Sequence, residues 1–306
     1  MAGGNSTPTK LQLHNNSMIQ TAFTFDVASH RRLLEQFLVE DLGADDITTV
    51  ATVPPDRQAE GRFVAKSPMV LAGINVASEV FWLLDHKVSV QTSWRDGDSL
   101  KAGDVPVTIR GRARALLSGE RVALNLLQRL CGIATLTRKF VDAVGGTQAK
   151  ILDTRKTTPG LRVFEKYAVT CGGGLNHRFS LNDAILIKEN HIRLAGGIRA
   201  AISLARRSRG NARFLEVEVT TLDELKEALK ESPDVIMLDN MTPAGVGEAV
   251  SVMRSQSHHQ LLIEASGGIT LENARQYAEA GVDWISIGAL THSAPAVDIS
   301  LEIGRD

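Results

Sequence analysis

"FLEVEVTTLDELKEALKESPDVIMLDN", residues 214–240, sets an apolar segment, an amphipathic segment and a second apolar segment one after another. The outer segments, 214–219 and 234–239, are short and rich in Val, Ile and Leu, as in strands that are buried on both faces. The middle segment, 222–232, repeats leucine at the spacing of one helix face. The stretch therefore predicts a strand, a covering helix and a second, parallel strand.

The same alternation continues on both sides of this stretch. Further strands are expected at 149–153, 184–188, 260–266 and 283–288. Further amphipathic helices are expected at 196–209, 243–256 and 271–281. Repeated strand–helix units favour a parallel sheet covered by helices. None of these strands is followed by G-x-G-x-x-G, so a barrel fits better than an open dinucleotide-binding sheet.

The N-terminal part of the chain is organised differently. Residues 1–17 are polar and predict an unstructured arm, and residues 26–43 predict a helix that ends at Gly43. Between 48 and 112 the sequence predicts short strands punctuated by Gly, Asp and Pro. Residues 113–144 return to a helical pattern with a buried leucine face.

Composition excludes several classes of protein. The chain has 306 residues and a net charge of -1, which does not support a general nucleic-acid binder. Cys131 and Cys171 are the only cysteines, too few for a disulfide framework or a thiolate metal site. The chain shows neither a signal-peptide layout nor an apolar run long enough to cross a bilayer. We therefore expect a cytoplasmic protein with no membrane partner.

Polar side chains and glycines follow the predicted strands. In a barrel of this type the active site lies at the carboxyl ends of the strands. Those ends carry Asp153 to Lys156, Lys188 and Glu189, Glu218, Asp239, Ser266 to Gly268, and Gly288 and Ala289. The cations that crowd 152–178 could form a solvated basic surface. Their place at strand ends favours a pocket for a small polyanion instead.

Each candidate residue has a chemical role and a structural alternative. Arg155 and Arg178 could grip a carboxylate or phosphate, or form ordinary ion pairs. His177 could hold a substrate carboxylate, or only brace Arg178. Lys188 could bind phosphate, form a Schiff base, or pair with Glu189.

Two further features point to a phosphorylated substrate. Glu218 and Asp239 could share a hydrated Mg²⁺, or neutralise neighbouring lysines. The turns "SGG" (266–268) and "IGA" (287–289) match the barrel position at which backbone N–H groups hold a phosphate. Cys171 has no sign of activation, so a catalytic thiol is not expected.

Three long motifs carry a family resemblance. "LDTRKTTPGLRVFEKYAV" (152–169), "GGGLNHR" (172–178) and "LIKENHI" (186–192) together resemble the signature of the quinolinate phosphoribosyltransferase family. The similarity extends over nearly the whole chain beyond the first twenty residues. Two departures, Asp45 in place of Gly and Ala265 in place of Ser, lie outside the positions expected to bind substrate.

The resemblance implies a fold, a reaction and partners. The fold class is α/β, with a disordered arm at 1–20, an N-terminal α/β sandwich domain at 21–132 and an incomplete, TIM-like α/β barrel at 133–289. Residues 290–306 would pack on the N-terminal domain. The reaction converts quinolinate and phosphoribosyl pyrophosphate (PRPP) to nicotinate mononucleotide, pyrophosphate and CO₂, with Mg²⁺ and no organic cofactor. A homodimer is implied, with assembly to a hexamer left open, and no nucleic acid partner.

The resemblance also assigns residues. The carboxylates of quinolinate would meet Arg155, His177 and Arg178, with Arg121 donated by the partner subunit. Thr154 would also contact substrate. Lys156 and Lys188 would bind the pyrophosphate region, while Glu218 and Asp239 would hold the ribose hydroxyls and Mg²⁺; these four would be the catalytic residues. The 5-phosphate would be bound by Ser266, Gly267, Gly268, Ile287, Gly288 and Ala289, with His292 nearby.

Three other functions remain open. An aldolase would form a Schiff base through Lys188, which borohydride would trap. A non-catalytic anion sensor would bind quinolinate and release no CO₂. A related phosphoribosyltransferase would use nicotinate without decarboxylation, although "TRKTTPG" and "NHR" favour a dicarboxylate pocket.

Overall fold

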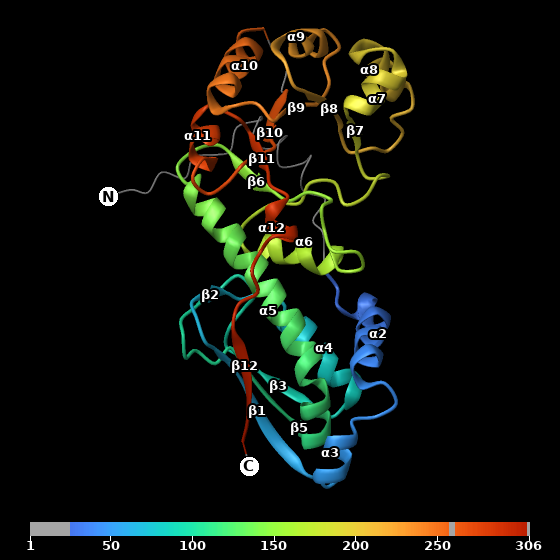
Figure 1. Cartoon of the computed structure of the whole chain (residues 1–306), viewed down its shortest axis with the longest axis vertical. Helices are drawn as coiled ribbons and strands as arrows, with labels where there is room; N and C mark the ends of the chain where they lie inside the picture. Colours follow the sequence, from blue (N-terminus) through green and yellow to red (C-terminus); the bar gives the residue numbers. More distant parts are fainter. Residues whose placement is uncertain (1–24, 257–260, 305–306) are drawn as a thin grey trace, which may run out of the picture. The chain divides into compact units, whose positions relative to one another are not determined.

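The computed structural model describes residues 25–256 and 261–304, and its internal contacts divide them into two units (Figure 1). The parallel-sheet unit comprises residues 139–155 and 174–288. The antiparallel-sheet unit comprises the described residues up to Arg138, residues 156–173, and the C-terminal segment from Ala289. The arm expected at 1–20 lies outside the described residues.

The antiparallel-sheet unit is built on four strands in the order β12-β1-β5-β3. These are β1 (Gln58–Ala65), β3 (Ser89–Gln91), β5 (Val107–Arg112) and β12 (Ile299–Gly304). The last strand of the chain therefore pairs with β1 along its whole length. Two short strands, β2 (Met69–Val70) and β4 (Ser99–Leu100), form a separate ladder. The strands expected between 48 and 112 are confirmed.

The helices of this unit include four that the sequence analysis missed, namely α3, α4, α6 and α12. The set is η1 (Ala28–His30), α2 (Arg31–Leu42), α3 (Ile47–Thr52), α4 (Ile74–Leu84), α5 (Ala113–Ala143, of which residues up to 138 belong here), α6 (Arg162–Cys171) and α12 (Ala289–His292). The helix expected at 26–43 is confirmed as α2, which ends at Gly43 with φ 56°. The expectation of strands alone between 48 and 112 is wrong, because α3 and α4 lie there.

Capping and packing explain these two helices. Asp46 accepts a hydrogen bond from the Thr49 amide at 2.9 Å and so caps α3. Asp96 accepts from the Gly73 and Ile74 amides at the start of α4. The α4 sequence is rich in β-branched and aromatic residues, yet burial of one face overrides that preference. In the described ranges, no helix combines the length and apolarity needed to cross a bilayer.

The parallel-sheet unit has six strands in the order β6-β11-β10-β9-β8-β7, all paired in parallel. They are β6 (Lys150–Leu152), β7 (Ile185–Ile187), β8 (Leu215–Val219), β9 (Val235–Asp239), β10 (Leu262–Ser266) and β11 (Trp284–Ser286). The helices are α7 (Glu189–Ala195), α8 (Ile198–Arg207), α9 (Leu222–Lys230), α10 (Pro243–Gln256) and α11 (Ala274–Glu279). Figure 1 shows α8 to α11 around the outer side of the sheet.

The barrel is incomplete, as expected. Among the described residues β6 and β7 are not paired with each other, and the segment between them touches β6 only through a bridge from Leu175 to Leu152. An apolar cluster fills the interior, formed by Leu152, Ala184, Phe214, Val235, Leu262 and Trp284. This core holds the strand ends in fixed positions.

The register decides which side chains share the inner face. Met237 of β9 is opposite Glu218 on one side and Glu264 on the other, and Asp239 is opposite Ser266. Side chains alternate along a strand and paired residues point to the same face. These residues and Glu216 therefore all lie on the face that carries the apolar core. Asp239 and Ser266 are nearest the carboxyl ends of their strands.

Candidate active site

A lysine and a carboxylate meet at the carboxyl ends of β7 and β8. The Nζ atom of Lys188 lies 2.6 Å from Oε2 of Glu218. Lys188 therefore pairs with the neighbouring strand rather than with Glu189, the first residue of α7. The ammonium group is half-exposed, so it lacks the apolar burial that commonly activates a Schiff-base lysine.

The donor set at the ends of β8 and β9 fits Mg²⁺. Glu218 and Asp239 lie on the same inner face, are both half-buried, and offer carboxylate oxygens, the ligands that Mg²⁺ prefers. Asp239 Oδ2 accepts from Asn240 Nδ2 at 2.6 Å, which orients the carboxylate. Glu218 also neutralises Lys188, and a carboxylate with two oxygens can serve both partners.

The turn after β10 has a backbone that requires glycine. Gly267 has φ +90°, and a Cβ atom there would lie 2.2 Å from Oδ1 of Asn240. The Asn240 amide donates to the Ser266 carbonyl at 2.9 Å, which holds the β9 and β10 ends together. The glycine turn expected at 266–268 is therefore a tightly fitted loop at a strand end.

Gly267→Ala should raise the KM for a phosphorylated substrate bound at this turn by about tenfold, equivalent to ~1.4 kcal/mol. A residue with a Cβ is strained at this φ and must also push Asn240 aside, so the loop backbone shifts. Gly146→Ala is the matched control, because Gly146 has φ +81° and open space around it. Steady-state kinetics and melting temperatures of both variants check this. Equal effects of the two substitutions on KM would contradict a role for the loop.

Arg178 is held inside the parallel-sheet unit. Its side chain is 6% exposed, and Nη1 donates to the Ala184 carbonyl at 3.1 Å. The preceding residues are fixed by the buried Asp153, whose carboxylate accepts from the His177 amide at 2.9 Å and from Asn176 Nδ2 at 2.6 Å. Burial lowers the pKa of Arg178, and the nearby Arg155 cation lowers it further. Two cations this close favour the binding of an anion.

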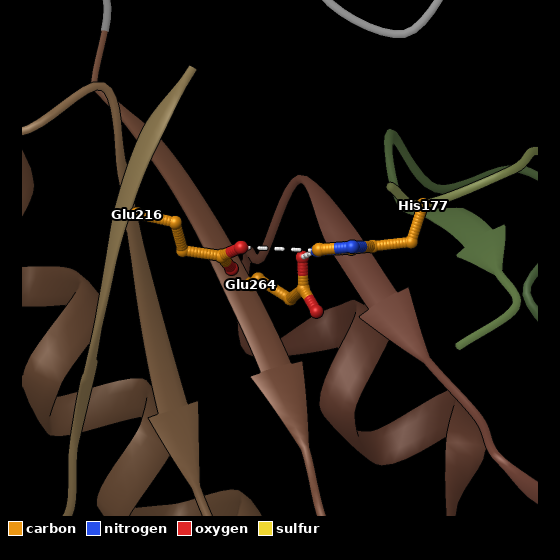
Figure 2. Close-up of side chains that lie close together, drawn as sticks. All are labelled: His177, Glu216 and Glu264. Carbon is orange, nitrogen blue, oxygen red and sulfur yellow. Dashed lines mark ion pairs between the residues drawn. The ribbon is translucent and has the colours of Figure 1, made fainter. Parts of the chain in front are cut away.

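His177 lies deeper, against two glutamates (Figure 2). Its Nε2 atom is 3.0 Å from Glu216 Oε2 and 3.3 Å from Glu264 Oε2, and both glutamates are fully buried. Its Nδ1 atom accepts a hydrogen bond from the Arg178 amide at 2.8 Å. Burial lowers the pKa of His177, and the Glu264 and Glu216 charges outweigh burial and raise it, which by itself favours a protonated ring. A protonated Nδ1, however, could not accept the Arg178 amide, so this hydrogen bond holds the ring in its neutral form.

Sequence analysis missed Glu216 and Glu264. The sequence held a signal, because each is a charged residue set between two apolar residues of a buried strand. Burial and the neighbouring Glu264 raise the pKa of Glu216 to about 7.

The remaining predicted site residues fall in both units. Thr154, Arg155, Ile287 and Gly288 belong to the parallel-sheet unit, and Arg121, Lys156, Ala289 and His292 to the antiparallel-sheet unit. The Lys156 carbonyl accepts from Thr291 Oγ1 at 2.8 Å. Arg121 is exposed on α5, and its side chain makes no hydrogen bond or ion pair to the part of the chain described. Burial raises the pKa of Cys171 to about 12, as expected for a thiol that is not activated.

Comparison with known proteins gives the same family over both units. The sequence profile of the quinolinate phosphoribosyl transferase N-terminal domain matches residues 46–131, and that of the C-terminal domain matches residues 133–302. A probable nicotinate-nucleotide pyrophosphorylase (carboxylating) of Bacillus subtilis is 46% identical over 273 residues, covering 89% of this chain and 93% of that protein. The Mycobacterium leprae nicotinate-nucleotide pyrophosphorylase (carboxylating) is 43% identical over 284 residues, covering 91% and 98%.

A solved structure agrees with these relatives. NadC from Streptococcus pyogenes superposes with a TM-score of 0.87 at 41% identity, covering 92% of this chain and 98% of that one. The matches include the strand ends and the turns described above. The chain belongs to the quinolinate phosphoribosyltransferase family.

Proposed function

We propose that this chain transfers the 5-phosphoribosyl group from PRPP to quinolinate, with release of pyrophosphate and CO₂, to give nicotinate mononucleotide for NAD synthesis. The observation that carries the proposal is the buried Arg178 guanidinium, near a second cation at Arg155 and without a carboxylate at ion-pair distance in the described residues. Quinolinate supplies the missing anions, because it carries two adjacent carboxylates. The carboxylating names of the 43–46% identical relatives support the same reaction.

The chemistry needs positioning and charge rather than a protein nucleophile. The ring nitrogen of quinolinate attacks C1 of the phosphoribosyl donor while pyrophosphate leaves, so positive charge develops on the sugar. The resulting pyridinium ring takes up the electron pair when the carboxylate next to the nitrogen departs as CO₂, and a proton replaces it on that carbon. Arg155 and Arg178 orient the ring through its carboxylates.

The donor would be held by the other strand ends. Lys188 and Lys156 would bind pyrophosphate oxygens, and Glu218 and Asp239 would hold the ribose hydroxyls and Mg²⁺, which would supply charge neutralisation for pyrophosphate. Backbone N–H groups of 266–268 and 287–289, with His292, would hold the 5-phosphate. We further propose a homodimer in which Arg121 enters the neighbouring subunit's site, and a cytoplasmic location.

One assay tests the function directly. Quinolinate labelled with ¹⁴C at its 2-carboxyl should release ¹⁴CO₂ only when PRPP and Mg²⁺ are both present. Release without PRPP would indicate a simple decarboxylase. Binding of quinolinate without any release under all conditions would indicate an anion sensor.

Asp239→Asn should lower turnover by about tenfold, or ~1.4 kcal/mol in the barrier, and should shift the Mg²⁺ requirement to higher concentration. The substitution keeps the size of the side chain and removes the charge that would hold the ion or the ribose. Mg²⁺ titrations of the initial rate check this, with Asp223→Asn on the exposed face of α9 as the control. If the initial rate of Asp239→Asn depends on Mg²⁺ concentration as the wild-type rate does, the Asp239 carboxylate has only a structural role.

A further inference from the structure

We propose that Glu216 and Glu264 are positioning residues for Arg178 and act on it through His177. The two carboxylates hold the imidazole at Nε2, and the imidazole holds the Arg178 backbone at Nδ1. We call His177, Glu216 and Glu264 the buried triad. The kinetic consequence rests on the proposed function, since it concerns the binding of quinolinate.

The buried triad joins three separate segments of the parallel-sheet unit. Glu216 comes from β8, Glu264 from β10, and His177 from the loop that follows the Leu175 bridge; in Figure 2 their side chains point toward one another. Two aromatic rings also pack against the imidazole. The centroid of the His177 ring lies 5.5 Å from that of Phe214 and 6.5 Å from that of Trp284, and both rings are nearly perpendicular to it. The ring is thus fixed in orientation as well as in place.

The hydrogen bond at Nδ1 shows where the ring carries its proton. Nδ1 accepts from the Arg178 amide, so its lone pair is occupied and the proton of the ring is on Nε2. Nε2–H therefore faces the two carboxylates at 3.0 and 3.3 Å. Apart from this Nε2–H, no hydrogen-bond donor of the described residues reaches the four carboxylate oxygens.

Such an arrangement is costly to the fold. A fully buried carboxylate without good hydrogen bonds loses several kcal/mol of solvation, and apolar residues of similar volume commonly stabilise a core better. Residues that break the rules of core packing tend to lie at functional sites. A role limited to stability therefore explains Glu216 and Glu264 poorly.

The position of Arg178 gives the triad a role. Arg178 is fixed at three points: its amide on His177 Nδ1, its Nη1 on the Ala184 carbonyl, and the preceding amide on Asp153. The negative charge of Glu216 also opposes the effect of burial on the pKa of Arg178, and so helps to keep the guanidinium charged. A bidentate contact with a carboxylate tolerates little displacement, so the anchoring of this backbone matters for substrate binding.

A metal ion is the competing occupant of the same residues. One nitrogen and two carboxylate oxygens of the triad all lie within 4.8 Å of one another, as three metal ligands would. A metal-bound Nε2, however, needs a free lone pair and leaves the proton on Nδ1. The Arg178 amide occupies Nδ1 as a donor, which favours a proton at Nε2 over a metal.

The first arm of the test uses the wild-type protein. In ¹H–¹⁵N NMR of histidine side chains, His177 should show a slowly exchanging Nε2–H and an Nδ1 that carries no proton. A proton on Nδ1, or a stoichiometric divalent metal whose removal changes the His177 signals, overturns the proposal. This arm does not depend on any substrate, so it stands even if the protein fails to release CO₂ from quinolinate.

The second arm uses two neutral isosteres and a matched control. Glu216→Gln and Glu264→Gln should each raise the KM for quinolinate about tenfold, with the KM for PRPP within about twofold of wild type. Both should also shift the Arg178 amide resonance. The control is Asp283→Asn, which removes a partly buried carboxylate that accepts a hydrogen bond from the amide of Ile263 in β10. It should lower the melting temperature and leave the quinolinate KM unchanged. Equal changes in both KM values, or no change in either, would mean that the triad is merely structural. If the variants do not fold, the position of the His177 proton in the wild-type NMR spectrum tests the proposal.

Discussion

Arg178→Lys should raise the KM for quinolinate by about a hundredfold, or ~2.7 kcal/mol, in a protein that still folds. Lysine keeps the positive charge but has no planar fork, so it cannot make two parallel hydrogen bonds to one carboxylate. The buried setting makes the loss larger, because no water can take over the second contact when the side chain is only 6% exposed.

The control for this substitution is Arg254→Lys. Arg254 lies in the same unit and pairs with Asp283, directly before the start of β11, at 2.8 Å, with no contact to Arg178. Its kinetics should match those of the wild type. Initial rates at varied quinolinate and saturating PRPP measure the effect, and thermal melting confirms folding. An unchanged quinolinate KM in Arg178→Lys would remove this arginine from the pocket.

The parts of the fold that sequence predicted best are those with strong periodicity. The βα alternation from β8 to β11 places Glu218, Asp239 and Ser266 at strand ends, and the register then puts them on one face. Only local pattern is needed for this, because parallel strands end at the same edge of a sheet. The family resemblance extended the prediction to the incomplete barrel.

The burial of individual side chains and their pairing between strands could not be predicted from the sequence. Pairing with Glu189 was one of three alternatives for Lys188, and the structure instead pairs it with Glu218 on the next strand. From the sequence alone, His177 could either bind substrate or brace Arg178. Its contacts with Glu216 and Glu264 could not be inferred from the spacing of residues along the chain. Each of these contacts joins segments far apart in the chain, so only the folded core decides them.

The α4 helix shows a different kind of limit. Its sequence "INVASEVFWLL" contains β-branched and aromatic residues that favour strands locally. Val76, Val80 and Phe81 are all fully buried on one side, and this packing determines the helix. Single-residue preferences are small compared with the burial of such a face.

Arg121 leads to the prediction with the largest effect. It is exposed on α5 and makes no polar contact with the described residues, so its guanidinium is available to a second subunit. We propose that it completes the quinolinate pocket of a second subunit. Arg121→Ala and Arg155→Ala should then each be nearly inactive as pure proteins, since each pocket in either homodimer lacks one arginine.

Mixed dimers of these two variants should recover activity. In such a dimer the barrel of the Arg121→Ala chain keeps its own Arg155 and receives Arg121 from its partner, so that site is complete. The site in the barrel of the Arg155→Ala chain lacks both arginines. Random exchange between symmetric dimers makes about half of them mixed, each with one working site in two, so about a quarter of wild-type activity should return. The variants, carrying different affinity tags, would be refolded together in equal amounts and the mixture assayed for nicotinate mononucleotide; the mixed dimers purified from it through both tags should show about half of wild-type activity. Arg121→Ala refolded with Arg121→Lys is the control, since neither chain can supply the arginine. Because complementation needs a residue from each chain in one pocket, inactivity of confirmed mixed dimers would show that Arg121 does not act across the interface.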